Sequence, residues 1–221
     1  MLFQDFIKYI PKIEKEKLMA TDAHAKMAPL ERISFLKEES YSNKNPRKAA
    51  VLMLFYPKNG VTHLALIVRN SYPGVHSSQI GFPGGKVELE DENLAATALR
   101  ETHEEIGVSA DKVEIIKPFS TIYIPPSNFL VYPFMGTSEF ELNFIPDLEE
   151  VKRVLEFPLS LFLDDNSITN VKMTTSYAND LEVPAFMVGK YVVWGATAMM
   201  MSELKEVIKN VVYQNEGSKI L

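Results

Sequence analysis

The chain has 221 residues, of which 46% are hydrophobic and 24% charged, as in ordinary soluble globular proteins. Its net charge of −6 argues against broad nucleic-acid binding, which depends on Lys and Arg neutralising phosphates, but not against a small anionic substrate. No apolar run reaches the length of a bilayer span, the N-terminus lacks a secretory signal, and cysteine is absent. We therefore expect a cytoplasmic protein with no membrane partner, no nucleic-acid partner and no disulfide.

The first 46 residues are expected to form an arm and not a separate domain. Apolar residues recur at helical spacing between residues 3 and 18, and Pro11 predicts a break in that helix. The polar stretch that follows adds too few apolar residues for a core of its own. We interpret residues 1–46 as an N-terminal helical arm, residues 47–213 as the main domain and residues 214–221 as a flexible tail.

The main domain is predicted to have an α+β fold with a mixed sheet. β-rich runs at 49–55 and 63–69 flank a turn-forming cluster at 56–60, which predicts a hairpin. Further elements are expected in this order: strands at 113–124, 129–137 and 154–157, a helical turn at 158–163, a hairpin at 169–177 and 181–186, a short strand at 191–193, and an amphipathic helix at 195–212.

The segment from Gly81 to Val108 has the most informative pattern in the chain, with a glycine turn, an acidic loop and a helix that ends at Gly107. Three carboxylates fall within roughly 100° of the helix circumference; they belong to Glu101, Glu104 and Glu105. The neighbouring arc is the expected core face, formed by Ala95, Ala98, Leu99, Thr102 and Ile106. Because like charges at this spacing destabilise a helix, the cluster is better explained by a bound divalent cation.

This segment resembles the Nudix box, written as Gly, five residues, Glu, seven residues, then Arg-Glu-aliphatic-x-Glu-Glu-x-Gly-aliphatic. The positions that match are Arg100, Glu101, Glu104, Glu105, Gly107 and Val108. Two positions depart from it, since six residues separate Gly85 from Glu92 and Thr102 stands at the aliphatic place. The resemblance implies an α/β/α sandwich that hydrolyses a nucleoside diphosphate linked to another group.

The expected cofactor is Mg²⁺ or Mn²⁺. Mg²⁺ typically takes one or two carboxylates together with water and substrate phosphate oxygens. Glu101 and Glu105, one helical turn apart, are the first choice of ligands and Glu104 is the next. The resemblance adds the backbone carbonyl of Gly84 as a further ligand.

Two other roles remain to be assigned around the box. Arg100 is expected to orient a box glutamate, with Glu92 as a candidate partner. The loop acids Glu88, Glu90 and Asp91 are expected to face solvent. The general base comes from the box or from a later loop, where Glu149 and Glu150 are candidates and Glu150 is preferred; an exposed acidic turn is an equally good interpretation of that pair.

Several segments resemble the coenzyme A diphosphatase branch of the Nudix family. They are 66–70, 82–85, 97–101, 104–107, 183–186 and 193–198, so that the resemblance extends from about residue 47 to residue 205. The extra loop residue before Glu92 is common in this branch. The resemblance to this branch implies cleavage of coenzyme A to a phosphopantetheine product and adenosine 3′,5′-bisphosphate.

One departure from this branch concerns the loop before the box, where Gly74 and Ser78 replace an expected Arg and Gly. Arg69, His76 and Lys86 remain candidates for contacts with substrate phosphates. For His76 the alternative is an ordinary exposed loop histidine, and for Arg69 it is a structural ion pair.

Two alternative functions stay open at this point. One is a Nudix hydrolase of ADP-ribose, a dinucleotide or another nucleoside diphosphate derivative, and the other is a Nudix-fold binding module without turnover. The intact carboxylate set weighs against the binding module. Apolar residues in the arm could also support a homodimer.

Overall fold

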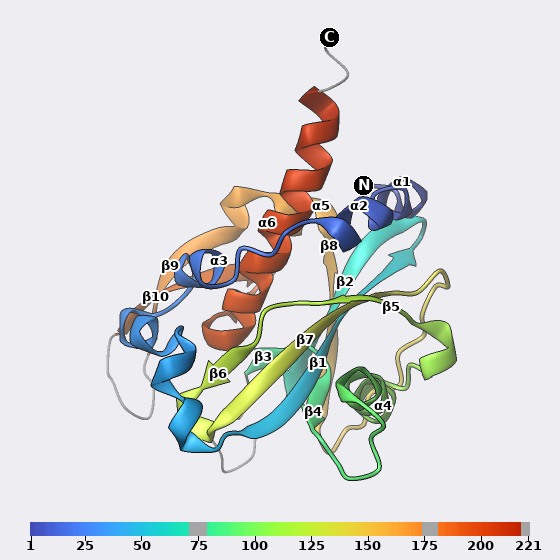
Figure 1. The fold of residues 1–221 in the computed structure, drawn as a ribbon. Coiled ribbons are helices and arrows are strands. Elements are labelled where there is room, and N and C mark those ends of the chain that lie inside the picture. The colour runs from blue at the N-terminus through green and yellow to red at the C-terminus, as the bar shows by residue number, and fades with distance from the viewer. Residues whose placement is uncertain (71–78, 174–180, 218–221) are drawn as a thin grey trace.

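A computed structural model of the chain describes residues 1–70, 79–173 and 181–217, with side chains placed as far as Tyr213. The fold is α+β: one mixed sheet of eight strands lies between helix α4 (Leu94–Ile106) and helix α6 (Gly195–Gly217) (Figure 1). The predicted sandwich is therefore present. None of the helices in these described ranges is both long and apolar enough to cross a membrane.

Strand β1 (Arg47–Lys58) is the centre of the large sheet. It forms an antiparallel hairpin with β2 (Val61–Arg69) and pairs in parallel with β7 (Phe129–Thr137). The hairpin turn consists of Asn59 and Gly60 alone, with φ of 49° and 72°, as a two-residue type I′ turn requires. The predicted hairpin is confirmed, but β1 continues through most of the cluster that the sequence assigned to the turn.

Two short strands replace the single strand predicted at 113–124, namely β5 (Glu114–Pro118) and β6 (Ile122–Ile124). Both pair antiparallel with β7. Between them, Ser120 donates from its backbone N–H and its hydroxyl to the Glu203 carboxylate of α6, at 3.0 and 2.7 Å. The strand is interrupted at Ser120 because its N–H and hydroxyl bond to α6 and not to the neighbouring strand.

The remaining strands complete two sheets. The large sheet also holds β3 (Ile80–Gly81), β4 (Gly84–Lys86) and β8 (Val151–Pro158). The small sheet has the order β11 (Tyr191–Val193), β10 (Leu181–Val188), β9 (Ile168–Met173). This confirms the second predicted hairpin, although residues 174–177 of its first strand lie outside the described residues. Helix α5 (Leu159–Leu163) confirms the predicted helical turn.

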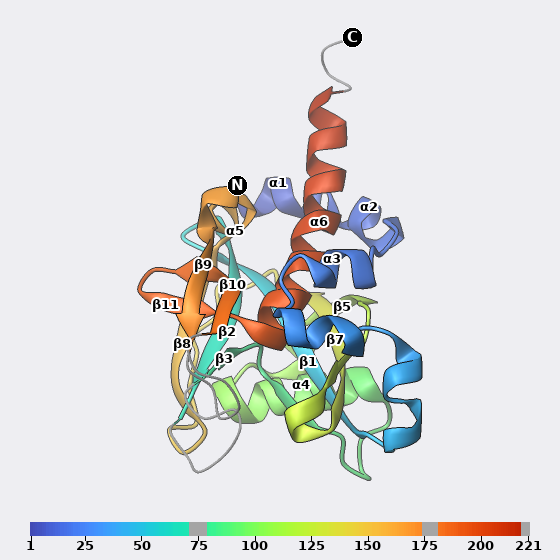
Figure 2. The same cartoon turned by 90° about the vertical axis from the view of Figure 1, so that its left-hand side faces the viewer.

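The N-terminal segment consists of short helices that pack on the main domain. They are α1 (Phe3–Ile7), α2 (Ile10–Lys15) and α3 (Thr21–Ala25), followed by the 3₁₀ turns η1 (Leu30–Phe35), η2 (Glu38–Ser40) and η3 (Ser42–Lys44). The helical break comes just before the expected position, because Pro11 lies in the first turn of α2, where its missing N–H is not needed. Helices α2 and α3 contact α6 (Figure 2).

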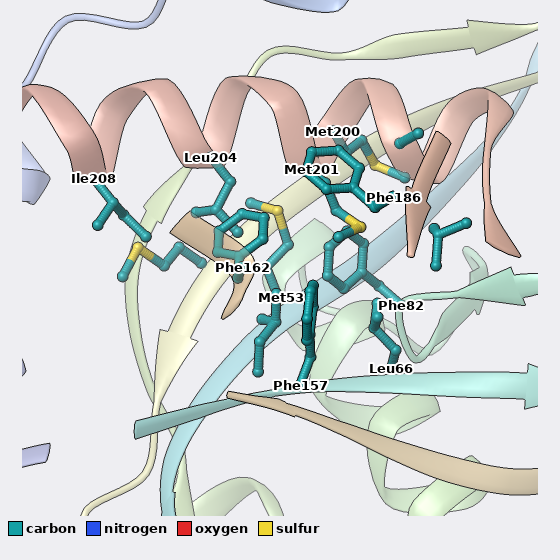
Figure 3. Packing of buried hydrophobic residues seen from close by; sticks show 14 of the residues in the cluster. Met53, Leu66, Phe82, Phe157, Phe162, Phe186, Met200, Met201, Leu204 and Ile208 are labelled. Carbon is teal, nitrogen blue, oxygen red and sulfur yellow. The ribbon is translucent and has the colours of Figure 1, made fainter. Parts of the chain in front are cut away.

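The main core lies between the sheet and α6. Met200, Met201, Leu204 and Ile208 project from this helix toward Phe162, Phe186 and the sheet residues Met53 and Phe157 (Figure 3). The predicted apolar face of the helix is confirmed, since Met199, Met200, Leu204, Val207, Ile208 and Val211 are all buried. The helix continues to Gly217, so residues 214–217 of the predicted tail are helical; residues 218–221 lie outside the described part.

Leu204 offers a direct test of this core because it is fully buried on the face of α6 that packs on the sheet. We predict that Leu204→Ala lowers the free energy of unfolding by about 2–5 kcal/mol, since it removes apolar contacts and leaves a cavity. Leu161→Ala, at a 53% exposed position, is the matched control and should change it by less than about 0.5 kcal/mol. Urea unfolding, monitored by circular dichroism, measures the free energy of unfolding of both variants. Equal losses in the two variants would contradict this placement of the core.

Candidate active site

Helix α4 begins and ends where local chemistry requires it to. The side-chain oxygen of Asn93 accepts the Ala96 N–H at 3.0 Å and caps the first turn. Gly107 follows the last turn with φ of 73°, the left-handed conformation that glycine adopts most easily, as predicted. Thr102 is buried against the sheet, where its hydroxyl donates to the Ala98 carbonyl at 2.6 Å. The orientation of the helix is thus fixed, and its glutamates lie beside the buried face.

Glu105 is the most buried of the three box carboxylates, with 1% of its surface exposed. Its Oε2 accepts the backbone N–H of Gly84 at 2.8 Å. Gly84 pairs with Val51 of β1 and has φ of 146°, and a Cβ there would lie 2.3 Å from the Ala50 carbonyl oxygen. Only glycine fits this position, so β4 can bring its backbone against α4.

Arg69, the last residue of β2, contacts the same two groups. Its Nη2 donates to the Gly84 carbonyl at 2.8 Å, and its Nη1 lies 3.1 Å from Glu105 Oε1. The sequence left Arg69 open between a substrate contact and an ion pair, and the structure shows the ion pair. His76, together with the departures at Gly74 and Ser78, lies outside the described residues.

Glu101 lies against the backbone of Gly85, where an added Cβ would come within 2.4 Å of the carboxylate. The side chain of Glu101 is 14% exposed, whereas that of Glu104 is 56% exposed. Arg100 joins them, with Nη1 at 3.2 Å from Glu101 Oε1 and 2.8 Å from Glu104 Oε2. The three glutamates therefore differ in environment, because Glu101 and Glu105 line the site while Glu104 reaches toward solvent.

Asp91, and not Glu92, is the partner of Arg100. Its Oδ1 and Oδ2 accept from Arg100 Nε and Nη2 at 2.8 and 3.1 Å, and it also accepts the Thr97 hydroxyl at 2.8 Å. The Asp91 side chain is 4% exposed and Glu92 is exposed, so the expectation that Asp91 faces solvent was wrong. The spacing offered a signal, since five residues separate Gly85 from Asp91, the interval of the Nudix box with Asp in place of Glu.

Glu150 reaches the site from the loop between β7 and β8. The N–H of Asp147 donates to the Glu105 carbonyl at 3.0 Å, and the N–H of Asn70 donates to the Glu150 carbonyl at 2.8 Å. Burial raises the pKa of both Glu101 and Glu105, and the charge of the exposed Glu150 side chain adds a smaller effect in the same direction. The structure thus brings together β2, β4, α4 and this loop, which no local sequence pattern links.

Lys86 is exposed at the end of β4, and its carbonyl accepts from Arg100 Nη2 at 3.0 Å. Its side-chain amine forms no ion pair with any residue that the structure describes. Lys86 therefore remains a candidate for contact with an anionic substrate.

The electrostatics of the site favour an added positive charge. Burial raises the pKa of Glu105 to about 7, with smaller contributions from the nearby Glu101 and Glu150, although Arg69 and the Gly84 N–H oppose the shift. Burial likewise raises the pKa of Glu101. Two desolvated carboxylates with a third nearby are stabilised in their charged form by a cation.

The donor set fits a hard divalent cation. Glu105 Oε1 is buried and has no hydrogen-bond donor, even though Arg69 is close to it. Within the described ranges, no three Asp, Glu or His side chains already converge as a preformed metal site. An octahedral oxygen-ligated ion needs only one or two carboxylates when a carbonyl, water and substrate phosphates complete its shell. Glu101, Glu105 and the Gly84 carbonyl provide such a partial set.

The NUDIX domain family matches residues 45–175, more than half of the chain, so the chain belongs to the Nudix hydrolase family. Nudix hydrolases generally use divalent metal cations. The crystal structure of a Nudix hydrolase from M. smegmatis, RenU, has a similar fold, with a TM-score of 0.52, 15% identity and coverage of 75% of this chain and 87% of that one.

Two relatives match the chain at higher identity. The uncharacterised Nudix hydrolase NudL of Enterobacter sp. is 35% identical over 72% of this chain and 82% of its own length. The mouse mitochondrial coenzyme A diphosphatase NUDT8 is 31% identical over 70% of this chain and 75% of its own length.

The bidentate pair of Asp91 and Arg100 predicts a stability effect that depends on pH. Asp91→Asn should cost about 1–3 kcal/mol near neutral pH, because it removes a charge-assisted pair with a half-buried guanidinium. Hydrogen bonds from Arg100, assisted by those from the Glu88 N–H and Thr97, hold the pKa of Asp91 well below its ordinary value. Its contribution is therefore complete above the unfolded pKa of about 3.9 and is lost as pH falls through the folded pKa.

Urea unfolding of Asp91→Asn and the unmodified protein at several pH values measures this contribution. The difference between them should be constant above about pH 5 and shrink below about pH 4. Glu92→Gln is the matched control and should change stability by less than about 0.5 kcal/mol. A larger loss from Glu92→Gln than from Asp91→Asn would contradict the assignment of the pair.

Proposed function

We propose that this chain hydrolyses the diphosphate bond of coenzyme A or its derivatives, with Mg²⁺ or Mn²⁺ as the cofactor. The products are a phosphopantetheine species and adenosine 3′,5′-bisphosphate. The observation that carries the catalytic proposal is the buried Glu105 carboxylate, which is held by Gly84 and has one oxygen without a hydrogen bond. The choice of coenzyme A is supported by similarity to NUDT8 and by the box-flanking segments of the sequence.

In this proposal Glu101, Glu105 and the Gly84 carbonyl hold the cation, and Glu104 contributes at the solvent side. A bound divalent cation polarises phosphoryl oxygens and neutralises charge that develops in the transition state. Arg100 is a positioning residue, because Asp91 fixes its guanidinium and the guanidinium in turn holds Glu101. Lys86, exposed beside the box, contacts a phosphate of the substrate.

Glu150 acts as the general base. It accepts a proton from the attacking water as the new P–O bond forms, and the bond between the attacked phosphorus and the bridging oxygen breaks. The second phosphate leaves with the electron pair of that bond. Glu150 suits this role because it is exposed and close enough to influence the charges of Glu101 and Glu105. The backbone of its loop is also hydrogen-bonded to α4 and to Asn70, the residue that follows β2.

A homodimer and a cytoplasmic location remain part of the proposal. Names of relatives refer to mitochondria and peroxisomes, and cell fractionation tests the cytoplasmic location against these two.

A substrate panel separates coenzyme A from other nucleoside diphosphate derivatives. With Mn²⁺ or Mg²⁺ present, we expect coenzyme A, acyl-coenzyme A or oxidised coenzyme A to give adenosine 3′,5′-bisphosphate, as chromatography with mass detection would reveal. Brisk cleavage of ADP-ribose or a dinucleotide, with no cleavage of any coenzyme A species, would overturn the choice of substrate and leave the catalytic site unaffected.

Glu105→Gln tests the catalytic site itself. We expect kcat/KM to fall at least about 100-fold, since loss of a metal ligand removes several kcal/mol of transition-state stabilisation. Glu90→Gln, at an exposed position of the same loop-helix segment, is the matched control and should retain full activity. Near-normal activity of a folded Glu105→Gln protein would reject its role.

Glu150→Gln tests the base, with its neighbour Glu149→Gln as the control. A general base contributes about 10²- to 10⁴-fold to rate, so kcat should fall by that range in Glu150→Gln and change little in Glu149→Gln. Rates with saturating substrate and metal measure the difference. The opposite ranking of the two variants would transfer the role to Glu149.

A further inference from the structure

The pairing of β2 with β8 is irregular at Arg69, the residue of β2 that lies beside the box. Val68 pairs with Arg153 and Arg69 with Val151, so that β8 carries one extra residue, Lys152, at this point. Such bulges often redirect side chains next to active sites. Ala65 and Ile67 of β2 belong to the core beneath α4, and strand alternation puts the Arg69 side chain on that same face.

The backbone around Arg69 is held from both sides. The N–H of Arg69 donates to the Gln79 carbonyl at 3.0 Å, and the N–H of Asn70 donates to the Glu150 carbonyl at 2.8 Å. The Asn70 side chain also donates to the carbonyl of Glu149 at 3.2 Å. These hydrogen bonds fix the backbone of Arg69, and so they fix the point from which its side chain extends toward the box.

The guanidinium contacts both of the innermost groups proposed as cation ligands. It donates to the Gly84 carbonyl at 2.8 Å and lies 3.1 Å from Glu105 Oε1, and its side chain is 25% exposed. Arg100, by contrast, contacts Glu101 and Glu104 at the outer side of the box. Each oxygen that faces Arg69 is one that a divalent cation would also use.

We propose that Arg69 is a positioning residue that acts as the counter-charge of the metal-free site, and that it competes with the divalent cation for Gly84 and Glu105. This inference rests on the proposed function, because it takes those two groups to be cation ligands. Arg69 keeps the buried carboxylate paired when no metal is bound. Its charge also weakens metal binding in the absence of an anionic substrate, since like charges near a shared ligand repel.

Titration of Mn²⁺ into the protein without substrate, followed by calorimetry, tests the competition. Arg69→Gln removes the charge, so we expect it to bind Mn²⁺ roughly 3- to 10-fold more tightly than the unmodified protein. Arg69→Lys keeps the charge and should bind within about twofold of the unmodified protein. Arg153→Gln removes an exposed charge from β8 and should leave the affinity unchanged.

Thermal unfolding supplies a second measurement. Without metal, Arg69→Gln should have a lower Tm than the unmodified protein, because Glu105 loses its counter-charge. Saturating Mn²⁺ should narrow this difference in Tm. At equal Mn²⁺ concentration, the protein that binds the ion more tightly, Arg69→Gln, gains more in Tm.

Weaker or unchanged Mn²⁺ affinity in Arg69→Gln would overturn the inference. If Arg69→Gln does not fold, a weaker Mn²⁺ affinity of Arg69→Lys would also overturn the inference. It would show that the guanidinium contacts support metal binding and that its charge does not oppose it. Absence of Mn²⁺ binding in the unmodified protein would instead overturn the proposed metal site, and this inference with it.

Discussion

The candidate active site depends on one hydrogen bond, from the backbone N–H of Gly84 to the carboxylate of Glu105 at 2.8 Å. It ties α4 to β4, which is itself held by β1 through its pairing with Ala49, Ala50 and Val51. A side chain at Gly84 would collide with the backbone of β1, so the contact requires glycine. The result is a carboxylate that is almost wholly removed from water, and burial of a charged group is tolerated only when other groups compensate for it.

Two arginines pair with the box glutamates, and only one of them contacts Glu105. Arg100 is fixed by Asp91 and organises the outer side of the box, where it contacts Glu101 and Glu104. Arg69 reaches the inner side from β2 and contacts Glu105. Each arginine therefore pairs with different glutamates of one helix. It also gives the site a paired, folded arrangement before any cation or substrate binds.

Regular patterns in the sequence predicted most of the fold. The end of α4, the apolar face of α6 and the strand at 129–137 followed from periodicity and from the stop at Gly107. Contacts between distant segments did not follow, because periodicity describes one element at a time. The split between β5 and β6 depends on Glu203, 83 residues away, and the burial of Glu105 depends on β4. The burial of Asp91 was not predicted, because the geometry of the loop decides which acid reaches Arg100. The spacing of residues in the sequence indicates that geometry only weakly.

Above all, we propose that the buried carboxylate of Glu105 is a principal ligand of a catalytic divalent cation. Electron paramagnetic resonance of free aqueous Mn²⁺ tests it without substrate or turnover, because bound Mn²⁺ is lost from the free signal. We expect the unmodified protein to reduce that signal, and Glu105→Gln to bind at least about tenfold more weakly. Equal depletion by the unmodified protein and by a folded Glu105→Gln variant would show that Glu105 is not a principal ligand.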